Sequence, residues 1–191
     1  MTVVERRIIE GLELRCELRE GKPPMVAGYA ALFNSLSVDL GGFKERIAPG
    51  AFRAALGGDV VGLLNHDANL VLSRQSNGTL RLQEDERGLP FEMDMPDTQA
   101  GRDTFALVKR GDVKGTSFAF SLEKGGASWH REGEQLVRTI TKVASLRDVG
   151  PVTFPAYPET SVATRSLKEW LAEEEAAAAR RRRRERLADL G

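Results

Sequence analysis

The alternation of large and small side chains between Ser117 and Leu122 constrains the fold more than any other stretch of the sequence. Phe118, Phe120 and Leu122 fall on one side of this period of two, and small residues fall on the other. Such a pattern predicts a strand with one buried face. Gly115, just upstream, allows a second backbone to come close. We therefore expect a strand that carries the Ser117 hydroxyl on the face opposite to its aromatic side chains.

Two other apolar segments bring polar groups to strand positions. The run from Val60 to Leu64 leads into His66, where a predicted buried strand meets a polar turn. The segment from Val143 to Val152 carries Asp148 inside a second apolar strand. An acid at such a position is costly to bury unless it is hydrogen-bonded or paired. His66 is one available partner.

These residue types together suit a hydrolase triad. A serine hydroxyl is a poor nucleophile until an imidazole accepts its proton, and a third group fixes the imidazole tautomer. Ser117, His66 and Asp148 could fill these three roles, but each is also an ordinary strand or turn residue in many proteins. His130, in a polar hairpin, is the only other imidazole. Because no Gly-x-Ser-x-Gly elbow is present, the residues alone leave a serine hydrolase as one candidate among several.

Composition narrows the classes of function. Lys and Arg together number 28, as do Asp and Glu, and this zero net charge argues against direct nucleic-acid binding. The single cysteine, Cys16, lies on the apolar side of a strand pattern, so we expect a small core residue and a reducing compartment. No apolar run approaches the roughly 20 residues of a membrane span. With two histidines and no phosphate-binding glycine loop, we expect neither a metal nor a cofactor.

The pattern as a whole predicts a mainly β protein with flanking helices (α+β). We expect about eight short strands forming a mostly antiparallel sheet, closed or nearly closed into a barrel. The strands are expected near residues 12–18, 25–33, 60–66, 79–83 with 89–95, 115–122, 127–131 with 135–140, and 143–152. Two short helices are expected at 48–56 and 98–110, the second burying residues 105–108.

The composition changes near Ser161, which divides the chain into a main domain (1–160) and a charged helical C-terminal tail (161–191). Acids at 173–175 precede five arginines at 180–184, an order that suits the helix dipole. An exposed helix explains this pattern, and so does a docking segment for an acidic partner. Both interpretations stay open.

Five blocks occur in an order that resembles one protein family. The blocks are Gly28-Tyr29-Ala30 with Phe33-Asn34; Glu45 to Phe52; Leu64-Asn65-His66-Asp67; Gly115 to Phe120; and Leu146-Arg147-Asp148-Val149 with Pro151 to Tyr157. They cover roughly residues 10 to 160. The chain resembles the caudovirus prohead proteases, the phage and gene-transfer-agent relatives of the herpesvirus assemblin maturation proteases.

The resemblance implies an assemblin-like β-barrel and a serine endopeptidase. By position, His66 matches the histidine of the family's Asn-His-Asp block, and Ser117 matches the nucleophile of its Ser-Phe-x-Phe block. The family usually has a glutamate where this chain has Asp148, and the assemblin relatives use a second histidine, so His130 stays an alternative third member. Arg74 lies where the family often has a Leu-Gly-Arg segment, and no role is assigned to it.

The resemblance also implies where the protein acts and on what. We expect it inside the assembling procapsid, in the cytoplasm of the bacterial host, as a homo-oligomer without membrane or direct nucleic-acid contacts. Expected substrates are the scaffolding segment, the major capsid protein and the protease's own ends, with the tail from Ser166 as a self-cleavage or capsid-docking segment. The alternative is a non-catalytic capsid-assembly protein of the same fold, and a small unrelated β-barrel binding module is less compatible with the five blocks.

Overall fold

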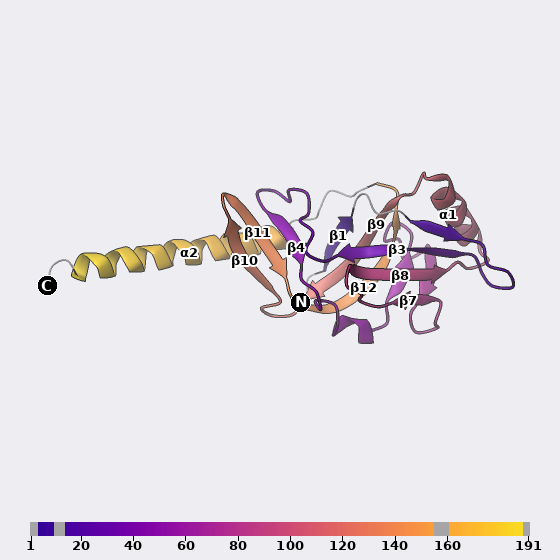
Figure 1. The fold of residues 1–191 in the computed structure, drawn as a ribbon, viewed down its shortest axis with the longest axis horizontal. Coiled ribbons are helices and arrows are strands. Elements are labelled where there is room, and N and C mark those ends of the chain that lie inside the picture. The colour runs from indigo at the N-terminus through magenta and orange to yellow at the C-terminus, as the bar shows by residue number, and fades with distance from the viewer. Residues whose placement is uncertain (1–3, 10–13, 155–160, 189–191) are drawn as a thin grey trace. The chain divides into compact units, whose positions relative to one another are not determined.

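The computed structural model describes residues 4–9, 14–154 and 161–188, and the chain divides into two compact units, Met1–Pro158 and Glu159–Gly191. Within the described residues, the first unit contains twelve strands, the helix α1 (Gln99–Arg110) and a short 3-10 helix, η1 (Ala55–Gly57). The second unit is the helix α2 (Ser161–Ala188). The prediction of a mainly β protein with helices is confirmed (Figure 1). No helix in the described part of the chain is long and apolar enough to span a membrane.

The strands form three sheets. The largest has five strands, in the spatial order β1 (Glu5–Ile9), β9 (Gly115–Leu122), β12 (Val143–Val152), β5 (Val61–Leu63) and β6 (Val71–Arg74). The second has four, in the order β2 (Arg15–Glu17), β3 (Met25–Leu32), β8 (Gly88–Asp94) and β7 (Leu80–Leu82). The third has three, in the order β10 (Ala127–Glu132), β11 (Gln135–Ile140) and β4 (Lys44–Ile47). Most pairings are antiparallel, whereas β12–β5 and β11–β4 are parallel.

None of these three strand orders closes on itself among the described residues, so the predicted barrel is not confirmed. The expected strand count was also too low. The sequence pattern missed β1, whose first three residues are all charged, and β6, which has only four residues. A strand that buries ion pairs in place of apolar side chains does not show the hydrophobic period on which such predictions depend.

The prediction of a helix at residues 48–56 is wrong. The chain there forms consecutive turns that end in η1, and Gly50 has a φ of 84°, which an α-helix does not allow. The backbone groups also bond elsewhere: the amide of Phe52 donates to Glu84 Oε1 at 2.8 Å, and the carbonyl of Ala51 accepts from the amide of Val143 at 2.8 Å. Tertiary contacts therefore replace the helical hydrogen bonds.

The helix expected at 98–110 is confirmed, with one correction to its buried face. Thr98 caps α1 by accepting a hydrogen bond from the amide of Gly101, and Gly111 ends the helix in the left-handed region with a φ of 86°. Of the four consecutive residues expected to be buried, only Val108 is buried, and Ala106 is exposed. Four residues in a row cover all sides of a helix and cannot share one face.

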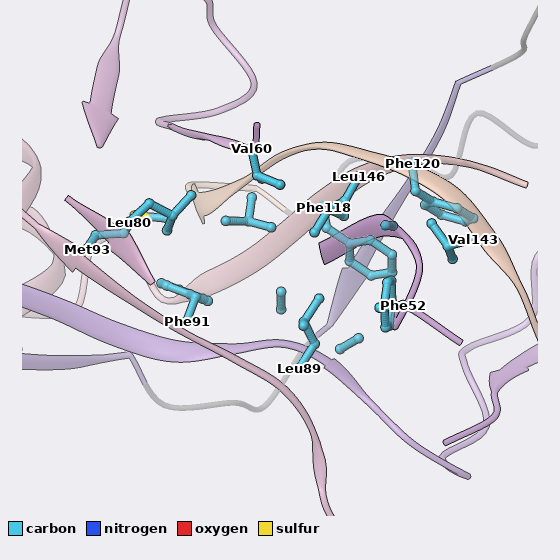
Figure 2. Packing of buried hydrophobic residues seen from close by; sticks show 14 of the residues in the cluster. Phe52, Val60, Leu80, Leu89, Phe91, Met93, Phe118, Phe120, Val143 and Leu146 are labelled. Atoms are coloured by element: carbon cyan, nitrogen blue, oxygen red, sulfur yellow. The ribbon is translucent and has the colours of Figure 1, made fainter. Parts of the chain in front are cut away.

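The aromatic face of β9 forms the centre of the core, as predicted. Phe118 and Phe120 are fully buried, with ring centroids 5.1 Å apart, and Phe52 packs edge-on against Phe118 at 5.5 Å. Leu89 and other buried side chains of the second sheet belong to the same cluster (Figure 2). Burying each such side chain contributes about 1.5–3 kcal/mol. The packing of its aromatic face therefore holds β9 in place, and the opposite face of the strand carries Ser117.

A buried cluster of four charges joins β1 to the third sheet. Arg7 binds Glu45 through two hydrogen bonds, Nε to Oε1 at 2.6 Å and Nη2 to Oε2 at 2.9 Å. Arg138 binds Glu5 in the same bidentate way, at 2.7 and 3.0 Å, and donates to Glu45 at 2.9 Å. The four side chains are at most 7% exposed. Such buried charges are tolerated because each one is paired and hydrogen-bonded.

This cluster predicts a loss of stability in acid. Burial alone would raise the pKa of Glu5, but the hydrogen bonds and positive charges of Arg138 and Arg7 outweigh it, so this pKa lies below its ordinary value. A lowered folded-state pKa means that the stabilisation by Glu5 is present above the unfolded-state pKa and is lost as the pH falls through the folded-state pKa. The free energy of unfolding should therefore fall below about pH 4.3.

Urea unfolding at a series of pH values measures this effect. Glu5→Gln should lower the free energy of unfolding at pH 7 by roughly 3 kcal/mol, because it leaves two buried guanidiniums with Glu45 as their one carboxylate in the cluster. It should also reduce the further loss in acid. The control Glu134→Gln, in the exposed β10–β11 turn, should follow the wild type at every pH. An unchanged acid profile for Glu5→Gln would contradict the assignment.

Candidate active site

Three neighbouring strands of the five-stranded sheet bring one polar side chain each to the same place. Ser117 lies on β9 and Asp148 on β12, where it pairs in register with Ala119 of β9 and Val61 of β5. His66 lies in the loop that follows β5. Paired residues of adjacent strands project from the same face. The face of β9 opposite to its core aromatics therefore carries the polar groups, as the alternation in the sequence predicts.

The imidazole of His66 bridges the other two residues. Its Nδ1 lies 2.5 Å from Asp148 Oδ1, and its Nε2 lies 2.5 Å from Ser117 Oγ. Because a carboxylate only accepts hydrogen bonds, Nδ1 carries a proton and Nε2 of the neutral ring is left to accept from the serine hydroxyl. The side chains of His66 and Asp148 are only 11% and 13% exposed. The structure thus brings together all three residues that the sequence singled out.

An aspartate reaches the imidazole, although the resemblance described above implies a glutamate, with a longer side chain, at this position. The pairing of β12 with β9 shifts register between Leu146 and Asp148, which marks a bulge or irregularity directly before the acid. Bulges redirect side chains and occur frequently beside active sites. The Nδ1–Oδ1 distance of 2.5 Å shows that the aspartate side chain reaches the imidazole from this position.

The loop after β5 is held in a conformation that few residues adopt. Asn65 and His66 both have a left-handed backbone, with φ values of 53° and 57°. Asn65 fastens this loop to the end of β12: its amide donates to the carbonyl of Pro151 at 3.0 Å, and its Oδ1 accepts from the amide of Thr153 at 2.8 Å. Left-handed non-glycine residues cost about 1–3 kcal/mol and persist where the surroundings fix them. Asn65 is therefore a positioning residue that the sequence did not reveal.

A close contact between β12 and β5 sets the spacing between the acid and the histidine. A Cβ added to Gly150 would lie 1.8 Å from the carbonyl oxygen of Leu63, so only glycine allows the two strands to approach this closely. Gly150 also pairs in register with Ser117. Gly150 on β12, the strand of Asp148, therefore contacts both β5, which precedes His66, and β9, which carries Ser117.

The other candidate residues lie in different surroundings. His130 is on β10, in the third sheet, where its Nε2 contacts Glu132 at 3.0 Å. Arg74 is half-exposed and pairs with Asp59. Burial raises the pKa of the Cys16 thiol, although Lys109 opposes this, and the Sγ lies 3.8 Å from the carbonyl of Phe105. A thiol kept protonated beside the core is a poor nucleophile.

No group of three or more His, Cys, Asp or Glu side chains in the described residues could hold a metal ion. The bridging imidazole itself has both nitrogens occupied by Asp148 and Ser117. This arrangement can transfer a proton from the Ser117 hydroxyl to the His66 ring, which the Asp148 carboxylate holds in place.

Comparison with known proteins identifies the family. The model of the family described as caudovirus prohead serine protease matches residues 11–173. The chain belongs to this family. It is a serine protease of prohead maturation, and the enzyme class predicted from the sequence is confirmed.

A solved structure is also similar to this chain. It is the capsid assembly protease of bacteriophage T4, with 11% sequence identity and a TM-score of 0.48. The similarity covers 78% of this chain and 99% of the T4 protein chain. No curated protein sequence matches the chain.

Replacing Asn65 by glycine should slow substrate processing. Asn65→Gly keeps the left-handed backbone accessible but removes the side-chain bond to Thr153, so His66 is held less firmly. We expect the cleavage rate to fall about 10- to 100-fold, the size of effect that misplaced catalytic groups produce. Asn34→Gly is the control, because Asn34 has a similar φ of 57° but lies after β3. Equal rates for the two variants would rule out a positioning role for Asn65.

Replacing Gly150 by alanine should disturb both stability and activity. The added methyl group meets the Leu63 carbonyl and must push β12 and β5 apart, which costs about 1–3 kcal/mol. Gly57→Ala is the control, since a Cβ there has no atom within 4 Å. Urea unfolding should separate the two variants, and the Gly57 variant should stay within about 0.5 kcal/mol of the wild type. A Gly150 variant as stable and active as the wild type would refute the close contact.

Proposed function

We propose that Ser117, His66 and Asp148 are the catalytic triad with which this prohead protease hydrolyses peptide bonds. The observation that supports this assignment is the continuous pair of contacts through the His66 ring, to Ser117 Oγ on one side and to Asp148 Oδ1 on the other. The residues are 51 and 82 positions apart from His66 in the chain, so only the folded sheet brings them together.

The mechanism is acyl transfer. Ser117 Oγ attacks the carbonyl carbon of the scissile bond while Nε2 of His66 accepts the hydroxyl proton. Asp148 keeps the ring in the tautomer that leaves Nε2 free, and it stabilises the imidazolium that forms. The imidazolium then protonates the leaving amine, and the C–N bond breaks. Water, deprotonated by the same ring, hydrolyses the acyl-enzyme and restores the serine.

The negative charge that develops on the carbonyl oxygen requires hydrogen-bond donors, and backbone amides supply them in this type of reaction. Each such donor contributes about 3–4 kcal/mol to the stabilisation of the transition state. Asp148 acts only through His66. In a comparable triad, exchanging the aspartate for asparagine reduces kcat by roughly 10⁴-fold, because the ring then adopts the wrong tautomer.

The substrates that we propose are the scaffolding segment and the major capsid protein of the capsid, and also the ends of the protease itself. Membership of the prohead protease family supports this class, and it supports action inside the procapsid in the bacterial cytoplasm. We further propose that the enzyme is a homo-oligomer and that its strands together form the assemblin-like barrel. Residues 1–160 would form the protease domain, and 161–191 a tail that docks on the capsid or is cleaved.

Co-expression with the capsid protein tests the nucleophile. Wild-type protease should yield truncated capsid protein, and Ser117→Ala should yield only the full-length form, as measured by intact mass. Ser121→Ala is the matched control: Ser121 lies on the same strand and is equally buried, but it bonds Ser145 and not His66. It should process normally, with a stability loss of about 1 kcal/mol. Processing by Ser117→Ala would overturn the assignment.

A further inference from the structure

The nucleophile assigned above is not accessible. Ser117 is 0% exposed, and its Oγ lies between the His66 ring and the Arg7 carbonyl of β1. β1 is the edge strand of the five-stranded sheet and pairs with β9 over five residues, from Glu5 opposite Phe120 to Ile9 opposite Thr116. Ile8 is the partner of Ser117 in this register. A protease whose serine is covered by its own chain cannot accept a substrate at that place until the covering strand leaves.

The contact reaches the reactive atom itself. Ser117 Oγ donates a hydrogen bond to the carbonyl oxygen of Arg7 at 3.0 Å. A hydroxyl has one proton, so the Arg7 carbonyl competes for it with Nε2 of His66. Attack requires the carbonyl carbon to approach within about 3–3.5 Å along a suitable direction. A carbonyl held by a hydrogen bond through its oxygen is placed beside the nucleophile without being positioned for attack.

The geometry of β1 is that of a docked extended peptide. Proteins that read extended peptides commonly add them as a strand to an exposed sheet edge, with main-chain bonds giving affinity and side-chain contacts giving selectivity. β1 has both kinds of contact: five register pairs with β9, and the buried side chains of Glu5 and Arg7 in the charge cluster. Arg6, between them, is exposed.

We propose that β1 occupies the edge of β9 at which substrates dock, and that Glu45 and Arg138 select a strand with an acid followed two residues later by an arginine. The inference rests on the proposed function, since it takes Ser117 as the nucleophile. β1 masks the site from within the same chain, and a substrate strand must replace it.

The selection follows from what stays behind when β1 leaves. Glu45 on β4 and Arg138 on β11 are register partners, and they keep the one hydrogen bond of 2.9 Å between them. Each loses its bidentate partner: Glu45 loses Arg7, and Arg138 loses Glu5. Glu45 and Arg138 then hold only one hydrogen bond between them, and their bidentate positions are unfilled. An incoming strand therefore binds best if it supplies an arginine and an acid at the same spacing.

Labelling of Ser117 by a fluorophosphonate tests the masking in the full-length chain. Arg6→Pro removes a strand amide and disfavours β1, while it keeps all four charged side chains of the cluster and the residue-6 carbonyl that accepts from Arg7 Nη1. The Arg6 side chain that it removes is exposed. We expect labelling, followed by intact mass, to be at least 10-fold faster than in the wild type. Arg6→Ala, the control, should stay within about 2-fold. Arg6→Gly weakens the strand more mildly and should accelerate labelling to a smaller extent, which keeps the test valid if the proline variant does not fold.

A peptide with the sequence of residues 4–9 tests the selection. Added to the Arg6→Pro protein, it should slow labelling again by refilling the edge of β9. Its two adjacent arginines provide a matched pair of variants with the same net charge. Exchanging the residue equivalent to Arg7 for alanine should weaken the protection at least 10-fold, because the bidentate contact to Glu45 is lost. Exchanging the one equivalent to Arg6 should change it by less than about 2-fold.

The outcomes separate this inference from the proposed function. Equal, rapid labelling of Ser117 in the wild type and the β1 variants would refute the masking and leave Ser117 as the nucleophile. Equal protection by the two alanine peptides would refute selection by Glu45 and Arg138. Failure to label Ser117 in any variant would overturn the nucleophile assignment, and this inference with it.

Discussion

The site depends on one ring that is held between two strands. Each nitrogen of His66 is committed to a different neighbour, Asp148 on β12 and Ser117 on β9, although His66 itself follows a third strand, β5. A displacement of these strands relative to one another would lengthen the contact of His66 with Asp148 or with Ser117. The features that fix them, the packed aromatic face of β9 and the close approach at Gly150, are therefore as necessary to the proposed chemistry as the polar groups.

The sequence predicted those parts of the fold whose stability comes from apolar periodicity. The strand β9, the helix α1 and the hairpins follow from alternation, capping residues and turn glycines. Prediction from the sequence failed where tertiary contacts determine the local structure. The segment 48–56 has helical composition, but the amide of Phe52 bonds the Glu84 side chain, and β1 is stabilised by ion pairs that leave no hydrophobic pattern. Sheet closure depends on long-range pairing, which local patterns do not encode.

The site was predictable to the extent that its chemistry resides in side chains. Residue type and strand position made Ser117, His66 and Asp148 candidates, and the family resemblance assigned their roles. The structure pairs His66 with Asp148 and not with His130. The role of Asn65 was not predictable, because it consists of a left-handed backbone and of bonds to another strand. The Arg7 carbonyl was equally hidden, since every residue has a carbonyl and only the register places this one beside Ser117.

The charge cluster that joins β1 to the third sheet is electrically balanced, with two carboxylates and two guanidiniums that are at most 7% exposed. Dissolved ions screen exposed charges over about 8 Å at physiological ionic strength, but they act much less on buried pairs. Changes in salt concentration are therefore a weak means of loosening this strand. On the proposed masking, the attachment of β1 at neutral pH depends instead on the shape and charge order of a chain that competes for the same edge.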